Sequence, residues 1–295
     1  MKYIVAVILF LGLMGCEKKV EFDLKEAKEL LTVDASIETN QDPVVVLTKS
    51  LNYFSKISAE VLANTIIKDA EVYISAGTTT HKLKRYDVVV PGTNIPFSFY
   101  SSDPASPSTI IRGESGKTYG LRIVWQGKEY TSNTTIPAIR KTIDSLWWVK
   151  APNTPDTSTK VVVRAKVTDP QPFGDYARYF TKVNSGNFLP GFNSVFDDAF
   201  VNGTSYTVDV DRGVDRNVEL DFENYGFFRK GDTVTIKFSN INKATFDFWR
   251  TVEFSYQSIG NPFSSPTKIL GNISNGGLGY FGGYANQFTT VIVPR

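Results

Sequence analysis

Alternating apolar and polar residues run through much of the chain and predict a protein built mainly of β-strands. One face of the first predicted strand carries Leu31, Val33, Ala35 and Ile37, and the other carries Thr32, Asp34, Ser36 and Glu38. The same period recurs at 72–76, 119–125 and 161–168, and further strands are predicted at 44–47, 176–183, 206–210, 218–222 and 234–238. Turn residues separate these segments, so the predicted fold class is mainly β.

The spacing of the strands predicts two β-rich domains. Short strands over residues 31–138 are typical of an immunoglobulin-like β-sandwich, in which 81–86 would be the hairpin partner of 72–76. A boundary is expected at 139–144. Residues 139–295 then form a second β-rich domain, which opens with the strand around Trp147 and Trp148.

One segment departs from the β pattern and predicts a helix near residues 243–258. It contains no Gly or Pro, and Asn242 can cap it. Spacings of three and four place Phe246, Trp249, Val252 and Tyr256 on one face. This aromatic stripe either packs in the core or forms a partner-binding surface.

The end of the chain is rich in glycine and aromatic residues. Gly276, Gly277, Gly279, Gly282 and Gly283 surround Tyr280 and Phe281, and a strand is expected at 288–293. Glycine loses much conformational entropy on folding, so this density needs a compensating role. The glycines either allow close backbone packing with Phe281 as a plug, or form a mobile loop at a binding surface.

The N-terminus predicts a lipoprotein signal. Residues 1–15 contain Lys2 and an apolar run that is too short to span a membrane. The run ends in Leu13-Met14-Gly15-Cys16, which matches a lipobox, so Cys16 is the expected lipidation site and residues 16–30 a tether. An ordinary secretory signal is the alternative, but Cys16 is the single cysteine and falls at the predicted cut. An unpaired cysteine in an exported protein calls for such an explanation.

Composition limits the remaining function classes. The hydrophobic content of 41% is sufficient for packed cores, and the net charge of +2 gives no basic field for nucleic acid. The glycines of the tail lack the context of a phosphate-binding loop, so no cofactor is expected.

Catalysis has little support in the sequence. His81 is the only histidine and is expected on the surface of a hairpin strand. The acidic pair Asp197-Asp198 would point to opposite faces of a strand. Because no nucleophile and base can be named together, we expect no enzyme activity.

Two binding chemistries remain open. Asp209, Asp211 and Asp215 surround Gly213 and form a weak calcium candidate, since Ca²⁺ prefers oxygen ligands. The alternative is a set of solvated acids at a strand end. Exposed Trp147, Trp148, Tyr280, Phe281 and Tyr284 could instead stack on sugars, and burial of these rings would argue against that interpretation.

Several segments together resemble one bacterial lipoprotein family, domain of unknown function 4249. They are the lipobox, Leu-Thr-Val-Asp-Ala-Ser-Ile from Leu31, Asp-Ala-Glu-Val-Tyr-Ile from Asp69, Gly-Lys-Thr-Tyr-Gly-Leu from Gly116, the helix, and the tail with Asn-Pro-Phe, Gly-Asn-Ile and Gly-Tyr-Phe-Gly. The resemblance implies an outer-membrane lipoprotein of Gram-negative bacteria, often encoded near TonB-dependent transporters. It supplies no catalytic residues.

Two functions are therefore expected as alternatives. The first is a non-catalytic lipoprotein that acts as an accessory or partner of a TonB-dependent transporter. The second is a glycan-binding lipoprotein that uses exposed aromatic residues. In both, the N-terminal lipid holds the protein to the outer membrane, and the sequence leaves the periplasmic and cell-surface faces open.

Overall fold

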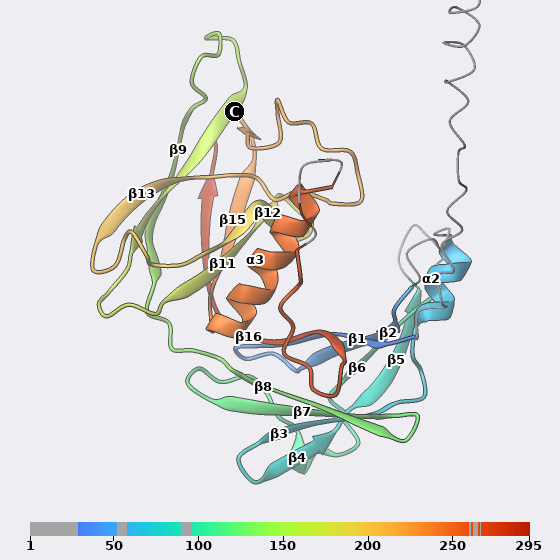
Figure 1. Ribbon diagram of the computed structural model, residues 1–295. Helices are drawn as coiled ribbons and strands as arrows, with labels where there is room; N and C mark the ends of the chain where they lie inside the picture. The colour runs from blue at the N-terminus through green and yellow to red at the C-terminus, as the bar shows by residue number, and fades with distance from the viewer. Residues whose placement is uncertain (1–28, 52–57, 90–95, 260, 262–264, 266) are drawn as a thin grey trace, which may run out of the picture.

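The computed structural model describes residues 29–51, 58–89, 96–259, 261, 265 and 267–295 (Figure 1). Strands make up 49% and helices 10% of the structure, which confirms the predicted mainly β class. The predicted signal peptide, Cys16 and most of the tether lie outside the described residues.

The order of elements follows the predicted strands closely. The strands are β1 (Leu31–Glu38), β2 (Val44–Lys49), β3 (Glu71–Ala76), β4 (Thr79–Lys82), β5 (Lys84–Val89), β6 (Pro96–Ser101), β7 (Thr118–Trp125), β8 (Lys128–Thr135), β9 (Thr142–Lys150), β10 (Lys160–Thr168), β11 (Tyr176–Val183), β12 (Leu189–Phe196), β13 (Ser205–Val210), β14 (Phe228–Arg229), β15 (Thr233–Ile241) and β16 (Leu278–Ile292). The helices are α2 (Ala59–Thr65), the 3₁₀ helix η1 (Pro107–Thr109) and α3 (Lys243–Gln257).

One large sheet joins the two predicted domains. Its strand order is β12-β11-β15-β16-β1-β2-β6-β5. The first part of β16 pairs in parallel with β1, and the second part pairs antiparallel with β15. Tyr284 lies at the change of partner, opposite both Glu38 and Ile241. In Figure 1 the red end of the chain accordingly runs from beside β1 to beside β15. The predicted boundary at 139–144 thus separates segments that share one sheet.

The first core lies between the β1 end of the large sheet and a small sheet of order β4-β3-β7-β8 (Figure 1). Alternate residues of β1, from Leu31 to Ile37, point into it, as the sequence predicts. Phe281 of β16 is fully buried there, where the sequence places a plug. Gly279, Gly282 and Gly283 therefore lie in an internal strand, whereas Gly276 and Gly277 lie in the turn that leads into it.

A second core fills the space between β11, β15 and the sheet of β13, β10 and β14, to which β9 is added beside β10. Hydrogen bonds also fix the chain at the predicted boundary between the two domains. The side-chain oxygen of Asn240 accepts hydrogen bonds from the backbone N–H groups of Arg140 and Lys141, at 3.1 and 2.9 Å. The segment predicted to be a domain boundary is therefore fixed to β15.

The predicted helix is α3, which covers the other face of the large sheet (Figure 1). Asn242 caps it by accepting a hydrogen bond from the Thr245 N–H at 2.9 Å. Phe246 and Phe248 are buried against Tyr280 and Tyr284, and Trp249 packs on the same cluster. Phe246, Trp249 and Val252 of the predicted stripe thus pack inward, together with Phe248, which was not part of the predicted face. Tyr256 packs instead beside Phe192.

Two local predictions are wrong. The predicted strand 218–222 is irregular, and Val218 and Phe222 are 60% and 70% exposed. Its alternation finds no partner strand. The predicted strand 81–86 is two strands: His81 pairs with Ile74 in the small sheet, whereas Arg85 pairs with Tyr100 in the large one. The chain therefore crosses between the two layers at Leu83.

Candidate functional site

The aromatic residues proposed for sugar stacking are mostly hidden. Tyr280, Phe281 and Tyr284 are 4%, 0% and 3% exposed, because β16 lies inside the large sheet between β1 and β15. Trp147 and Trp148 of β9 are half-buried, and Trp148 packs on the second core. The three tail rings therefore form no open stacking platform.

His81 is fully buried, which corrects the expectation of a surface residue. Its Nε2 accepts a hydrogen bond from the Asp103 N–H at 2.9 Å, and its Nδ1 lies 2.8 Å from the Thr109 hydroxyl. Because Nε2 is an acceptor, Nδ1 carries the proton and donates to Thr109. Both ring nitrogens therefore hold the segment from Asp103 to Thr109, which ends in η1, against β4.

The residues of the calcium candidate are not brought together. Asp209 pairs with Arg164 at 2.8 Å, and Asp215 accepts hydrogen bonds from the backbone and side chain of Asn217. Burial raises the pKa of Asp211, and the charge of Asp209 adds to that increase. Within the described ranges, these three do not form a group with metal-ligand spacing.

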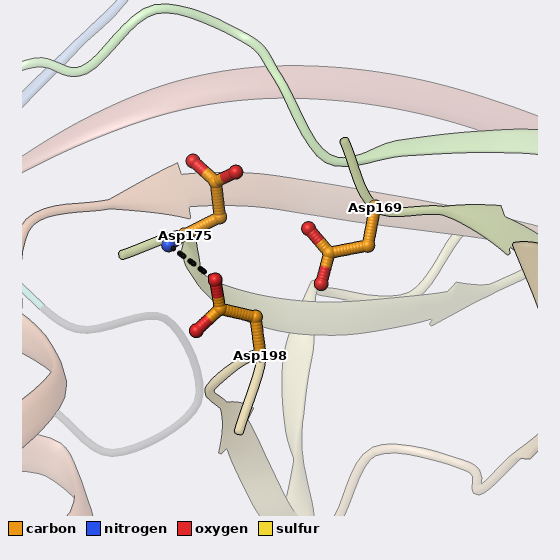
Figure 2. Close-up of side chains that lie close together, drawn as sticks. All are labelled: Asp169, Asp175 and Asp198. Carbon is orange, nitrogen blue, oxygen red and sulfur yellow. Dashed lines mark hydrogen bonds between the residues drawn. The ribbon is translucent and has the colours of Figure 1, made fainter. Parts of the chain in front are cut away.

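A different acidic cluster has that spacing. Carboxylate oxygens of Asp169, Asp175 and Asp198 lie within 4.8 Å of one another, and Figure 2 shows them converging from separate segments. One Asp198 oxygen accepts the backbone N–H groups of Gly174 and Asp175, at 2.7 and 3.1 Å. The sequence analysis missed this cluster because its members belong to loops after β10, before β11 and after β12.

Cations of the protein already occupy the acidic cluster. Lys141 Nζ lies 3.0 Å from Asp169, and both side chains are almost completely buried. Arg140 Nε lies 3.0 Å from Asp175. Burial raises the pKa of Asp169, while the Lys141 hydrogen bond and charge oppose that increase. The arrangement is a buried ion-pair network that joins the 139–144 segment to the second core.

A pocket of about 420 Å³ lies on the outer face of the large sheet. We call it the junction pocket, because strands from both halves of the chain form it. Its lining residues are Asp34, Ser36 and Glu38 of β1, Arg178 and Phe180 of β11, Lys237 of β15, Tyr280 and Tyr284 of β16, Trp249 of α3, and Leu189, Pro190 and 214–217 around β12 and β13.

Strand register explains why these residues meet. Asp34 lies opposite Tyr280, and Glu38 lies opposite Tyr284. In the pair formed by β15 and β11, Lys237 lies opposite Phe180. The floor of the pocket is therefore the polar face of β1 that the alternation predicted, continued across three more strands. Tyr280, Tyr284 and Asp215, which the sequence singled out for other reasons, also line it.

A chain of hydrogen bonds runs from α3 to Tyr280. The Trp249 indole N–H donates to the Tyr284 hydroxyl at 2.9 Å, and the Tyr284 and Tyr280 hydroxyl oxygens are 3.1 Å apart. Tyr280 lies opposite Asp34 in the ladder between β1 and β16. Burial raises the pKa of Tyr280 and Tyr284 above the ordinary value of 10.0, so both hydroxyls keep their protons at neutral pH.

Arg178 is held rigidly beside this chain. It is 3% exposed, and its Nε donates to the Ser194 hydroxyl at 3.1 Å. Its guanidinium carbon lies 3.4 Å from the centroid of the Trp249 ring and 4.7 Å from that of Phe180. Stacking of a guanidinium on aromatic faces is favourable and fixes the orientation of its N–H groups.

The two carboxylates on the pocket floor differ in their partners. Glu38 accepts from Lys237 at 2.8 Å and from Asn286 at 2.7 Å. Asp34 has no salt bridge among the described residues, and solvent reaches its side chain. Burial in the concave floor nevertheless raises the pKa of Asp34, with the charge of Arg178 and the Tyr280 hydrogen bond opposing that increase.

Comparison with known proteins decides the family. A family model described as "Domain of unknown function (DUF4249)" matches residues 17–290. The chain belongs to this family. The DUF4249 match includes every residue that lines the junction pocket and begins one residue after Cys16. A search of curated proteins gave no match. In the part of the chain that the structure describes, no helix is long and apolar enough to cross a membrane.

Proposed function

We propose that this DUF4249 protein is a non-catalytic lipoprotein, anchored in the outer membrane through Cys16, that serves as an accessory or partner of a TonB-dependent transporter. The observation that carries the proposal is the lipobox Leu13-Met14-Gly15-Cys16, which ends one residue before the family match begins. A chain processed at Cys16 would keep the whole matched region. Several buried acyl chains make such an anchor stable, since each CH₂ contributes about 0.8 kcal/mol.

The site geometry favours binding over catalysis. His81 is committed to two structural hydrogen bonds, and Lys141 is committed to Asp169. The junction pocket offers hydroxyl, carboxylate and guanidinium groups. Such groups can position a ligand or partner.

Acyl labelling tests the anchor. Cys16→Ala should leave the protein without label from radioactive palmitate, either soluble or as uncleaved precursor. Met14→Ala is the matched control, because the middle position of the lipobox tolerates substitution, and it should stay labelled in the outer-membrane fraction. If Cys16→Ala still carried label and sedimented with outer membranes, the anchor assignment would be wrong.

Affinity purification tests the partner. Tagged protein from mildly solubilised outer membranes should retain a TonB-dependent transporter that an unrelated tagged outer-membrane lipoprotein does not. Retention of polysaccharide with no transporter would instead support the glycan-binding alternative.

A further inference from the structure

We infer that the junction pocket binds a small zwitterion, namely an α-amino acid with an apolar side chain, with its ammonium group on Asp34 and its carboxylate on Arg178. This inference does not depend on the lipid anchor or on a transporter partner. The pocket volume of about 420 Å³ falls within the range of small-molecule sites, about 300–1,000 Å³.

Asp34 supplies the anionic half of the site. Among the described carboxylates of the pocket floor, Glu38 is already paired with Lys237, whereas Asp34 forms no salt bridge with a described residue. A carboxylate has about four lone-pair positions, so acceptor capacity remains. A primary ammonium group would fill it and would add the charge partner that Asp34 lacks.

Arg178 supplies the cationic half. A guanidinium has five N–H donors, and only its Nε–H is used by Ser194. The charge of Arg178 also acts on the Tyr284 hydroxyl and opposes the rise of its pKa. The other N–H groups of the Arg178 guanidinium remain as donors, and stacking on Trp249 holds the guanidinium in one orientation. The charge of Arg178 acts on the Asp34 carboxyl. The two groups are therefore near enough to bind the carboxylate and the ammonium group of the same ligand.

The apolar part of the ligand follows from the pocket wall. Leu189, Pro190 and Val214 line the side opposite β1 and can enclose an apolar side chain. A sugar fits less well, because stacking needs a free aromatic face. Arg178 covers a face of Trp249, and Arg178 and Lys237 both lie over Phe180, at 4.7 and 4.6 Å.

Calorimetry on the full-length protein in detergent tests the inference. L-phenylalanine, L-leucine and L-methionine are the probes, and at least one should bind. For phenylalanine, two analogues separate the two charges: 2-phenylethylamine lacks the carboxylate, and 3-phenylpropanoate lacks the ammonium. Each analogue should bind at least about tenfold more weakly than the amino acid, as expected when one charged hydrogen-bonding partner is lost.

Two variants locate the site. Asp34→Asn should weaken binding of the amino acid by about tenfold or more while leaving 3-phenylpropanoate unchanged. Asp156→Asn, which alters a fully exposed carboxylate between β9 and β10, should change nothing. Because Asp34 is open to solvent, its variant should fold, and circular dichroism checks this. Absence of binding by all three amino acids, equal binding of the analogues, or binding of glucose in their place would overturn the inference.

Discussion

Val33 and Gly279 lie opposite each other in the parallel ladder that joins β1 to β16, and a Cβ at Gly279 would lie only 1.9 Å from the Val33 backbone oxygen. Gly279 also has a φ of +91°, which side chains other than hydrogen rarely allow. The beginning and the end of the described chain therefore meet at a point where only glycine fits. This contact joins β1 to β16 within the large sheet that carries the junction pocket.

Substitution of Gly279 should therefore destabilise the whole fold. Gly279→Ala combines backbone strain with a clash against the main chain of β1. Gly276→Ala is the control, because its φ is +76° but no atom lies within 4 Å of the new Cβ. The control should lose about 1–2 kcal/mol of unfolding free energy from the left-handed conformation alone, and Gly279→Ala clearly more. Denaturant titration measures both, and equal losses would show that the close contact is unimportant.

The buried pair Lys141–Asp169 should be sensitive to the loss of one partner. Lys141→Ala leaves an uncompensated buried carboxylate and should cost about 3–5 kcal/mol of unfolding free energy. Arg140→Ala breaks a neighbouring but more exposed pair and should cost about 1 kcal/mol or less.

A double variant separates charge from packing at the same place. Lys141→Met with Asp169→Leu removes both charges and should recover most of the stability that Lys141→Ala loses. If the double variant were as unstable as the single one, the pair would matter for its shape or its hydrogen bonds rather than for charge compensation.

Trp249 should contribute both packing and a hydrogen bond. Its ring stacks under Arg178 and packs edge-on to Tyr280 at 5.2 Å, but it is only half-buried. Trp249→Ala should therefore lower the unfolding free energy by about 3 kcal/mol, the lower end of the range for large aromatic residues. Trp249→Phe keeps one ring but loses the second ring and the donor to Tyr284, so it should lose about 1 kcal/mol for the hydrogen bond plus the packing of the missing ring, and less than Trp249→Ala. An unchanged melting temperature in Trp249→Ala would mean that the ring serves binding alone.

Asp34 should reduce stability at neutral pH. Its folded-state pKa is raised above the ordinary value of 3.8, mainly by burial, so the folded state binds the proton more tightly than the unfolded state. Stability is therefore lost as the pH rises from 3.8 through the folded pKa, and it is regained below 3.8. Asp34→Asn should raise the melting temperature at pH 7, and the difference from the wild type should shrink in acid. A variant that is less stable than the wild type at pH 7 would contradict this account.

The local pattern of the sequence determined much of the fold. The alternation in 31–38 correctly separated the core face of β1 from its polar face, and the spacing of Phe246 and Trp249 located α3. These features depend on periods of two and about 3.6 residues, which a short segment carries by itself. The lipobox at Cys16 is equally local, and its processing stays a prediction.

Only the tertiary structure decided which strands pair and which polar groups meet. The pattern of β1 does not encode a parallel partner that lies more than two hundred residues away in the chain, and the pattern at 218–222 does not reveal that no partner exists. Backbone hydrogen bonds between strands are the same for most side chains, so pairing is selected by how the whole set of apolar faces can be buried. Asp34 and Arg178 share a pocket, and Lys141 and Asp169 form an ion pair, for that non-local reason.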